Sequence, residues 1–121
     1  MSDNTFKTDG TIDSFENRFI GRDYQIEFLA QEFTSVCPMT GQPDFGTITI
    51  TYTPGPRCIE LRSLKFYLQT YRNRGIFYED VVNTILDDIV AAISPVKATV
   101  RGDFNTRGGI SARIEATHPF E

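Results

Sequence analysis

The sequence is poor in the side chains that most often bind metals. It has one histidine and two cysteines in 121 residues, too few for a four-ligand structural zinc site or a histidine-based metal centre within one chain. Its two cysteines, Cys37 and Cys58, could form only one disulfide bond, which is a poor framework for a secreted scaffold. We therefore expect free thiols in a reducing cytoplasm and a site without a metal.

Long apolar runs and an excess of positive charge are also missing. The first twenty residues contain no apolar run of signal-peptide length, and no stretch approaches the ~18 residues of a membrane-spanning helix. Twelve Lys and Arg against sixteen Asp and Glu give a net charge of −4, whereas proteins dedicated to nucleic acids need a basic excess to neutralise phosphates. We expect neither a membrane nor a nucleic acid as a partner.

What remains is an ordinary globular composition in a short chain, with 40% hydrophobic and 23% charged residues. A chain of this length builds one core. Residues 1–23 are mostly polar, so we expect a weakly ordered segment there and a single folded domain over 24–121. So small a domain has little room for an enclosed cleft, and an active site built from it is expected to be shared between subunits.

Hydrophobic periodicity predicts the order β-β-α-α-β-β. Order is expected to begin near Tyr24, where apolar and polar residues alternate as in a half-buried strand. The strands are expected at 24–33, 47–53, 97–104 and 110–117, and the helices at 61–71 and 79–93. The Pro- and Gly-rich segment 37–46 is expected to be an irregular loop. This pattern predicts an α+β fold in which two helices cover one face of a four-stranded antiparallel sheet.

The predicted sheet has two open edges and one polar face. Residues 47–53 put Ile48, Ile50 and Tyr52 on one face and four threonines on the other. Open edges invite pairing with another chain. We expect an oligomer in which edges pair and the threonine face lines an interior surface, although short edges alone are an alternative way to limit aggregation.

Cys37 and Asp44 are the first candidate catalytic pair. Cys37 lies where a predicted strand breaks into the Pro/Gly segment, and Asp44 follows seven residues later in the same segment. A thiolate is a nucleophile, and a nearby carboxylic acid can move a proton to the group that the thiolate attacks. The alternative is that Cys37 is a passive small apolar residue. For Cys58 we favour a structural role.

The charges are unevenly distributed along the two predicted helices. Residues 57–74 contain five basic side chains and one acid, Glu60, whereas residues 79–88 contain four acids and no base. Arg62 and Lys65 are three residues apart and share a helix face, an arrangement suited to a phosphate-bearing cofactor. The alternative is a set of salt bridges between the two helices.

Arg107, Gly108 and Gly109 form a third candidate group. Adjacent glycines permit a close approach of the backbone to a ligand, with the arginine as an anion contact, but an ordinary hairpin turn explains the same residues equally well. His118 lies near the C-terminus, and we give it no catalytic role.

These segments, in this order, resemble the short, single-module NADPH-dependent 7-cyano-7-deazaguanine reductases, the nitrile reductases of queuosine biosynthesis. The resemblance covers residues 24–117 and is strongest in ELRSLKFY at 60–67, which is similar to the family signature. EFTSVCPMTGQPDF at 32–45 is similar to the segment that carries the family's catalytic cysteine and aspartate. Further matches are YRN at 71–73, Glu79-Asp80 with Asn83, and RGGIS at 107–111.

The resemblance implies roles for individual residues. Cys37 would attack the nitrile carbon and form a covalent thioimide, with Asp44 as the proton donor or acceptor. Glu79 would bind the edge of the deazaguanine. Glu60 and Leu61 would border the same pocket.

The cofactor and the architecture are implied in the same way. The phosphates of NADPH would be held by Arg62, Lys65 and Arg107. The family architecture is the tunnelling fold, in which four-stranded sheets join side by side into a barrel with the helices outside. It implies a homo-oligomer, a decamer of two stacked pentamers, with sites between subunits.

Two positions depart from the family pattern. Arg62 stands where the signature has a lysine, which keeps the charge but changes the donor geometry. Tyr78 stands where many members have a histidine, and a tyrosine does not titrate near neutral pH, so a proton relay at this substrate-binding position is in doubt.

Other classes of protein share the tunnelling fold. Zinc-dependent pterin cyclohydrolases are disfavoured by the single histidine, and archaeal amidinotransferases acting on modified tRNA are disfavoured by the intact signature at 60–67. A non-catalytic ring that binds a purine-like ligand is disfavoured by Cys37 and Asp44 in the matching segment.

Overall fold

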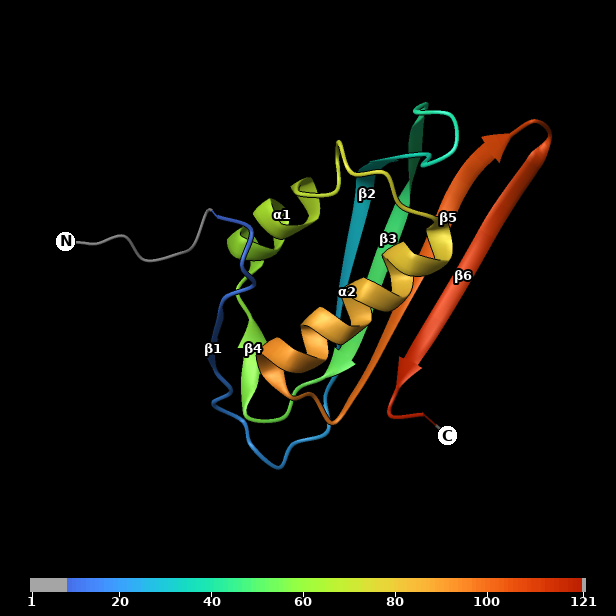
Figure 1. Ribbon diagram of the computed structural model, residues 1–121. Coiled ribbons are helices and arrows are strands. Elements are labelled where there is room, and N and C mark those ends of the chain that lie inside the picture. Colours follow the sequence, from blue (N-terminus) through green and yellow to red (C-terminus); the bar gives the residue numbers. More distant parts are fainter. Residues whose placement is uncertain (1–8, 121) are drawn as a thin grey trace.

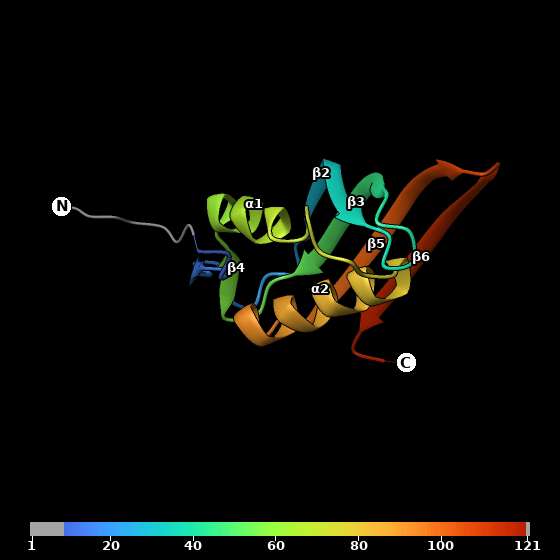
Figure 2. The same cartoon turned by 45° about the horizontal axis from the view of Figure 1, so that its top comes forward.

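The computed structural model describes residues 9–120 and shows a sheet with both helices on one of its faces (Figures 1 and 2). The strands are β1 (Ser14–Glu16), β2 (Ile26–Val36), β3 (Pro43–Thr53), β4 (Arg57–Ile59), β5 (Lys97–Arg107) and β6 (Ile110–His118), and the helices are α1 (Leu61–Gln69) and α2 (Tyr78–Ile93). The main sheet has the order β2-β3-β5-β6, and each neighbouring pair is antiparallel. The predicted α+β class, the four-stranded antiparallel sheet and the two helices are confirmed.

Order begins earlier than predicted. β1 pairs with β4 in a small second sheet, and Asn17 behind it is 3% exposed. The amide of Asn17 donates to the carbonyl oxygen of Gly55 at 2.8 Å and accepts from the hydroxyl of Tyr24 at 2.7 Å. The start of order near Tyr24 was therefore wrong for residues 9–23, because three-residue strands carry too little periodicity to be recognised. Residues 1–8 of the predicted weakly ordered segment lie outside the described residues.

The segment 37–46 is a loop only as far as residue 42. β3 begins at Pro43, so Asp44 and Gly46 are strand residues, and the prediction of an irregular loop was wrong for them. Proline is tolerated as the first residue of a strand. A side chain at position 46 would place its Cβ 2.6 Å from the carbonyl oxygen of Asp103. Glycine thus lets β3 and β5 approach closely, and Asp44 has a fixed position on a paired strand.

The core lies between α2 and the sheet. The α2 residues predicted to face the core, Val82, Ile85, Leu86, Ile89 and Ile93, are all buried. They belong to one cluster with Ile48, Ile50 and Tyr52 of β3. The threonines of β3 lie half-buried on the opposite, helix-free face. These two faces are confirmed.

α1 differs from its prediction at both ends. It ends at Gln69 rather than at Tyr71, and Leu61, expected in its apolar stripe, is 57% exposed. Tyr71 is buried after the helix has ended. Its hydroxyl lies 2.8 Å from that of Tyr67, which donates to Asp88 of α2 at 2.5 Å. This buried network joins α1 to α2. Neither helix of residues 9–120 is long and apolar enough to cross a membrane.

Candidate active site at one end of the sheet

Four side chains from separate elements meet at one end of the sheet. In Figures 1 and 2 the loop between β2 and β3, the start of α2 and the end of β5 lie at this end. The centre is Asp44, which is 6% exposed. Arg107 Nη1 lies 2.9 Å from Asp44 Oδ1, and the hydroxyl of Tyr78 donates to the same oxygen at 3.0 Å. Cys37 lies in the adjoining turn, where a side-chain hydrogen bond from Arg107 helps to lower the pKa of its thiol.

The turn that carries Cys37 favours the thiolate. It is closed by the hydrogen bonds Gly41 N–H to Cys37 O at 2.8 Å and Cys37 N–H to Gln42 O at 2.9 Å. The hydroxyl of Thr40, the backbone amides of Met39 and Thr40, and Arg107 together lower the pKa of Cys37 to about 7, against the opposing effect of burial. A thiol with this pKa is substantially ionised at neutral pH, as a nucleophile must be.

Asp44 uses only one of its two carboxylate oxygens. Arg107 and Tyr78 both bind Oδ1. Within residues 9–120 Oδ2 has no hydrogen-bond partner, and it is open to solvent, since the only buried side-chain oxygen or nitrogen without a partner there is Ser35 Oγ. Two charge-assisted contacts on one oxygen fix the position of the carboxylate. The second oxygen is left for another molecule or another state of the site.

Tyr78 is held by a ring stack. Its ring lies parallel to that of Phe104, with centroids 3.9 Å apart and planes inclined by 4°. Phe104 in turn rests on Gly102, where a Cβ would lie 2.6 Å from the ring. Burial raises the pKa of Tyr78, and the hydrogen bond to Asp44 raises it further. The hydroxyl therefore stays protonated and donates to Asp44 across the physiological pH range.

Ser35 is a neighbour of Asp44 that the sequence analysis did not single out. The two residues are directly paired between β2 and β3, and Ser35 is fully buried. Its hydroxyl is the one buried side-chain nitrogen or oxygen of residues 9–120 without a hydrogen-bond partner. The pairing could not be read from the sequence, because Asp44 was expected in a loop.

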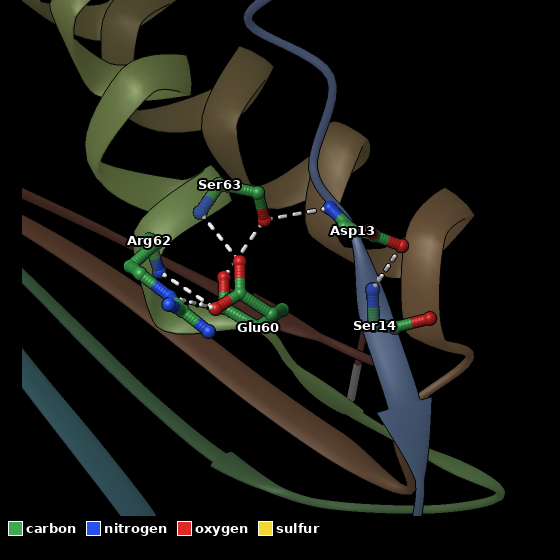
Figure 3. A network of polar contacts seen from close by, with 5 residues as sticks. All are labelled: Asp13, Ser14, Glu60, Arg62 and Ser63. Atoms are coloured by element: carbon green, nitrogen blue, oxygen red, sulfur yellow. Dashed lines mark hydrogen bonds and ion pairs between the residues drawn. The ribbon is translucent and has the colours of Figure 1, made fainter. Parts of the chain in front are cut away.

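Glu60 and Leu61 lie away from this end of the sheet, at the start of α1. Figure 3 shows the carboxylate of Glu60 capping its own helix: Oε1 accepts from Ser63 N–H at 2.7 Å, and Oε2 accepts from Arg62 N–H at 3.1 Å and from Arg62 Nε at 3.2 Å. Partial burial raises the pKa of Glu60, but these amide and guanidinium contacts outweigh it and leave that pKa lowered. One chain does not bring Glu60 and Leu61 to Cys37.

Two of the three predicted cofactor residues line a groove between α1 and β2. The groove has a volume of about 770 Å³, and its walls include Arg62, Lys65 and Arg72 beside apolar side chains. Such a lining fits a ligand that carries phosphates on an apolar or aromatic body. Arg107 does not line it and instead pairs with Asp44 at the end of the sheet.

The remaining candidates are arranged as follows. Glu79 is exposed on the first turn of α2, next to Tyr78. Cys58 is 4% exposed in β4, with its Sγ 3.7 Å from the hydroxyl of Tyr24, as the structural role predicts.

Arg62 forms an ion pair with Glu60 within the basic segment. In residues 9–120 no three His, Cys, Asp or Glu side chains are grouped as they would be around a metal ion.

Comparison with known proteins matches this chain to one family. Residues 43–121 match the family model described as QueF-like protein. A protein of Chlorobaculum parvum named NADPH-dependent 7-cyano-7-deazaguanine reductase is 56% identical over 110 residues, covering 91% of this chain and 95% of that protein. A protein of Rhodopirellula baltica with the same name is 53% identical over 121 residues, covering 100% of this chain and 99% of that protein.

A solved structure supports the fold. The crystal structure of the archaeosine synthase QueF-Like in the apo form has a TM-score of 0.72 and covers 77% of this chain and 91% of its own, at 22% sequence identity. At that identity the likeness bears on the fold alone.

Proposed function

The chain belongs to the family of NADPH-dependent 7-cyano-7-deazaguanine reductases, and we propose that Cys37, Asp44 and Tyr78 carry out its chemistry. The reaction reduces the nitrile of 7-cyano-7-deazaguanine to the aminomethyl group of 7-aminomethyl-7-deazaguanine, a step in queuosine biosynthesis. The observation that carries the assignment of residues is the lowered pKa of Cys37, about 7, beside the buried carboxylate of Asp44.

Cys37 is the nucleophile. Its thiolate adds to the nitrile carbon, which forms the C–S bond of a thioimide and leaves an electron pair on nitrogen that takes up a proton. Asp44 is the group placed to relay that proton: its Oδ2, which has no partner within residues 9–120, takes up the proton that the Cys37 thiol releases and passes it to the nitrogen. Arg107 and Tyr78 hold the carboxyl group in place while the proton moves. Reduction later breaks the C–S bond and returns the thiolate.

The cofactor is NADPH, each molecule of which would supply one hydride when bound, so that two are used per product. Arg62 and Lys65 in the groove between α1 and β2 are proposed to hold its phosphates. Arg107 was predicted to join them. Within one chain it lies at the end of the sheet and pairs with Asp44, so we propose that it reaches the cofactor only where a second subunit places its own groove beside that end.

The substrate is recognised by its polar edge. Glu79 is exposed on the turn that holds Tyr78, and a carboxylate can accept two parallel N–H bonds from a deazaguanine edge. Glu60 and Leu61 are proposed to border the pocket from a neighbouring chain. Since both oxygens of Glu60 already accept bonds within its own helix, we assign it to the pocket wall rather than to a direct carboxylate contact.

The site is therefore proposed to be completed by oligomerisation into a barrel of the tunnelling fold, a decamer of two stacked pentamers. The edge strands β2 and β6 carry large exposed apolar side chains, Leu29 at 55% and Ile110 at 74% exposure, which edge-to-edge pairing would cover. A cytoplasmic location, the absence of a metal and the absence of nucleic-acid binding remain predictions. Light scattering of the native protein tests the assembly, and a monomeric mass would contradict it.

The activity is tested by following NADPH oxidation against product with 7-cyano-7-deazaguanine as substrate. We expect about two NADPH oxidised per aminomethyl product, since nitrile to amine is a four-electron reduction. Cys37→Ala should abolish turnover, whereas the matched variant Cys58→Ala should retain it. Intact mass without NADPH should show a substrate adduct that Cys37→Ala lacks. Full activity in Cys37→Ala would overturn the assignment.

A further inference from the structure

Ser35 keeps a buried hydroxyl group without a partner. The residue is 0% exposed, and its Oγ is the single unsatisfied buried side-chain nitrogen or oxygen in residues 9–120. Folded proteins satisfy nearly all buried polar groups, and the exceptions call for a reason in function or strain. An alanine would fit the same position without the cost of an unpaired hydroxyl, so packing alone does not explain a serine here.

The position of Ser35 supplies a reason. It pairs directly with Asp44, and the next pair along the strands is Val36 with Pro43. Directly opposed residues of an antiparallel pair share a face, with Cβ atoms about 5 Å apart. The unpaired hydroxyl of Ser35, two residues before Cys37, therefore lies on the same face as the carboxyl group of Asp44, whose Oδ2 also has no partner within residues 9–120.

The chemistry of a hydroxyl suits this position. An ionised carboxylate only accepts hydrogen bonds, whereas a protonated one also donates. A serine hydroxyl can donate to the first form and accept from the second by turning about its C–O bond. Tyr78, which keeps its proton, and Arg107, which has no acceptor, bind Oδ1 as donors. Ser35, unlike Arg107, can serve both forms of Asp44, and unlike the hydroxyl of Tyr78 it is not already engaged at Oδ1.

We propose that Ser35 is a positioning residue for Asp44, whose hydroxyl binds the carboxyl group as it turns to exchange a proton with the substrate nitrogen. This inference rests on the proposed function and adds a residue to it. On this proposal the buried, unpaired hydroxyl of Ser35 lowers the stability of the fold and is retained because the reaction requires it.

The test compares Ser35→Ala with Thr34→Ala. Thr34 is the preceding residue, pairs with Phe45 and lies on the other face. We expect Ser35→Ala to have an equal or higher Tm, a kcat at least tenfold lower and an unchanged KM for NADPH, and Thr34→Ala to have a kcat within threefold of the wild type. The proposal would be overturned if Ser35→Ala had wild-type kinetics, or if its Tm fell together with its kcat, which would indicate a structural role.

A double-mutant cycle separates action through Asp44 from an independent effect. In the Asp44→Asn background, Ser35→Ala should lower the residual rate by less than twofold, because the group that it positions is already gone. An additive tenfold loss there would overturn the role as a positioning residue. Wild-type protein that fails to oxidise NADPH with the nitrile would overturn the proposed function itself, whereas normal wild-type turnover with an unaffected Ser35→Ala would overturn only this inference.

Discussion

The two carboxylates predicted for the site, Asp44 and Glu60, have opposite surroundings. Glu60 lies at the start of α1 with both oxygens bound by amides and a guanidinium of its own helix. Asp44 lies at the other end of the fold with two contacts on one oxygen and a serine hydroxyl without a partner on the paired strand. Glu60, whose two oxygens both accept hydrogen bonds, stabilises its own helix. Asp44, which has both contacts on Oδ1, keeps its other oxygen for the reaction.

The same contrast separates the polar networks of the core and of the site. Tyr71, which follows α1, is hydrogen-bonded to Tyr67 of α1, which in turn donates to Asp88 of α2. Burial raises the pKa of Tyr67 and of Tyr71. Tyr78 makes a similar bond to Asp44, but at the rim of the sheet, where Cys37 is half-buried. The tyrosine hydroxyls of the core are paired with each other and with Asp88, which helps to fix one structure, whereas within residues 9–120 the buried hydroxyl of Ser35 at the site is unpaired.

The largest expected effect comes from Asp44→Asn. The amide keeps the shape of the carboxyl group and removes its ability to deliver a proton, so we expect kcat to fall about a hundredfold or more. Asp87→Asn, on the exposed face of α2, is the matched control and should change kcat by less than twofold. Steady-state NADPH oxidation measures both. If Asp44→Asn retained a tenth of the activity, Asp44 would not be required as the proton donor, and the contrast with Glu60 would not concern catalysis.

A smaller loss is expected for Tyr78→Phe. The ring stack on Phe104 is kept and one hydrogen bond to a charged group, worth about 1.5–3 kcal/mol, is removed, so kcat should fall by roughly tenfold to a hundredfold and Tm should fall as well. The raised pKa of Tyr78 keeps the wild-type hydroxyl protonated throughout the neutral range. Tyr78→His should therefore introduce an ionisation near pH 6.5 into the rate profile. A profile identical to that of the wild type would show that this position does not touch the proton path.

The sequence predicted elements with strong periodicity well and contacts across the sheet poorly. The core face of α2 and the alternation of Ile48, Ile50 and Tyr52 follow from local patterns that burial enforces. By contrast, proline and glycine around Asp44 predict a loop, although pairing with β2 extends the strand to Pro43.

The candidate site was recognisable through family resemblance rather than through spacing. Cys37 and Asp44 stand seven residues apart, but their link to Tyr78 and Arg107 depends on how α2 and β5 return to the same end of the sheet. Ser35 carried no signal at all, since its meaning lies in a cross-strand partner and a missing hydrogen bond. The sequence also did not reveal that Glu60 caps α1, because a glutamate before a helix can equally be a cap or a ligand.

A shift in reactivity at Cys37 is the next smaller effect. The hydroxyl of Thr40 is the largest contributor to its lowered pKa of about 7, so Thr40→Val should raise that pKa and reduce the thiolate fraction at pH 7 several-fold. The pH dependence of iodoacetamide alkylation, read by intact mass, reports the midpoint. Thr11→Val, an exposed threonine of the N-terminal segment, should leave the midpoint unchanged, and buried Cys58 should stay unlabelled in the native protein. An unshifted midpoint in Thr40→Val would place the cause in the backbone amides of Met39 and Thr40 and in Arg107.

The smallest effect on catalysis is expected at Glu60, where the loss should appear in stability instead. Glu60→Ala removes the cap of α1 and should lower the free energy of unfolding by about 1 kcal/mol, with a substrate KM within threefold of the wild type; Glu115→Gln on β6 is the control. Because the pKa of folded Glu60 is lowered, its contribution is fully present above its unfolded pKa of about 4.3 and is lost as the pH falls through the lower, folded value. The stability gap between wild type and Glu60→Ala in urea titrations should therefore narrow below about pH 4. A tenfold rise in KM at unchanged stability would mean that the carboxylate binds substrate, and the distinction from Asp44 would then lie in position rather than in chemistry.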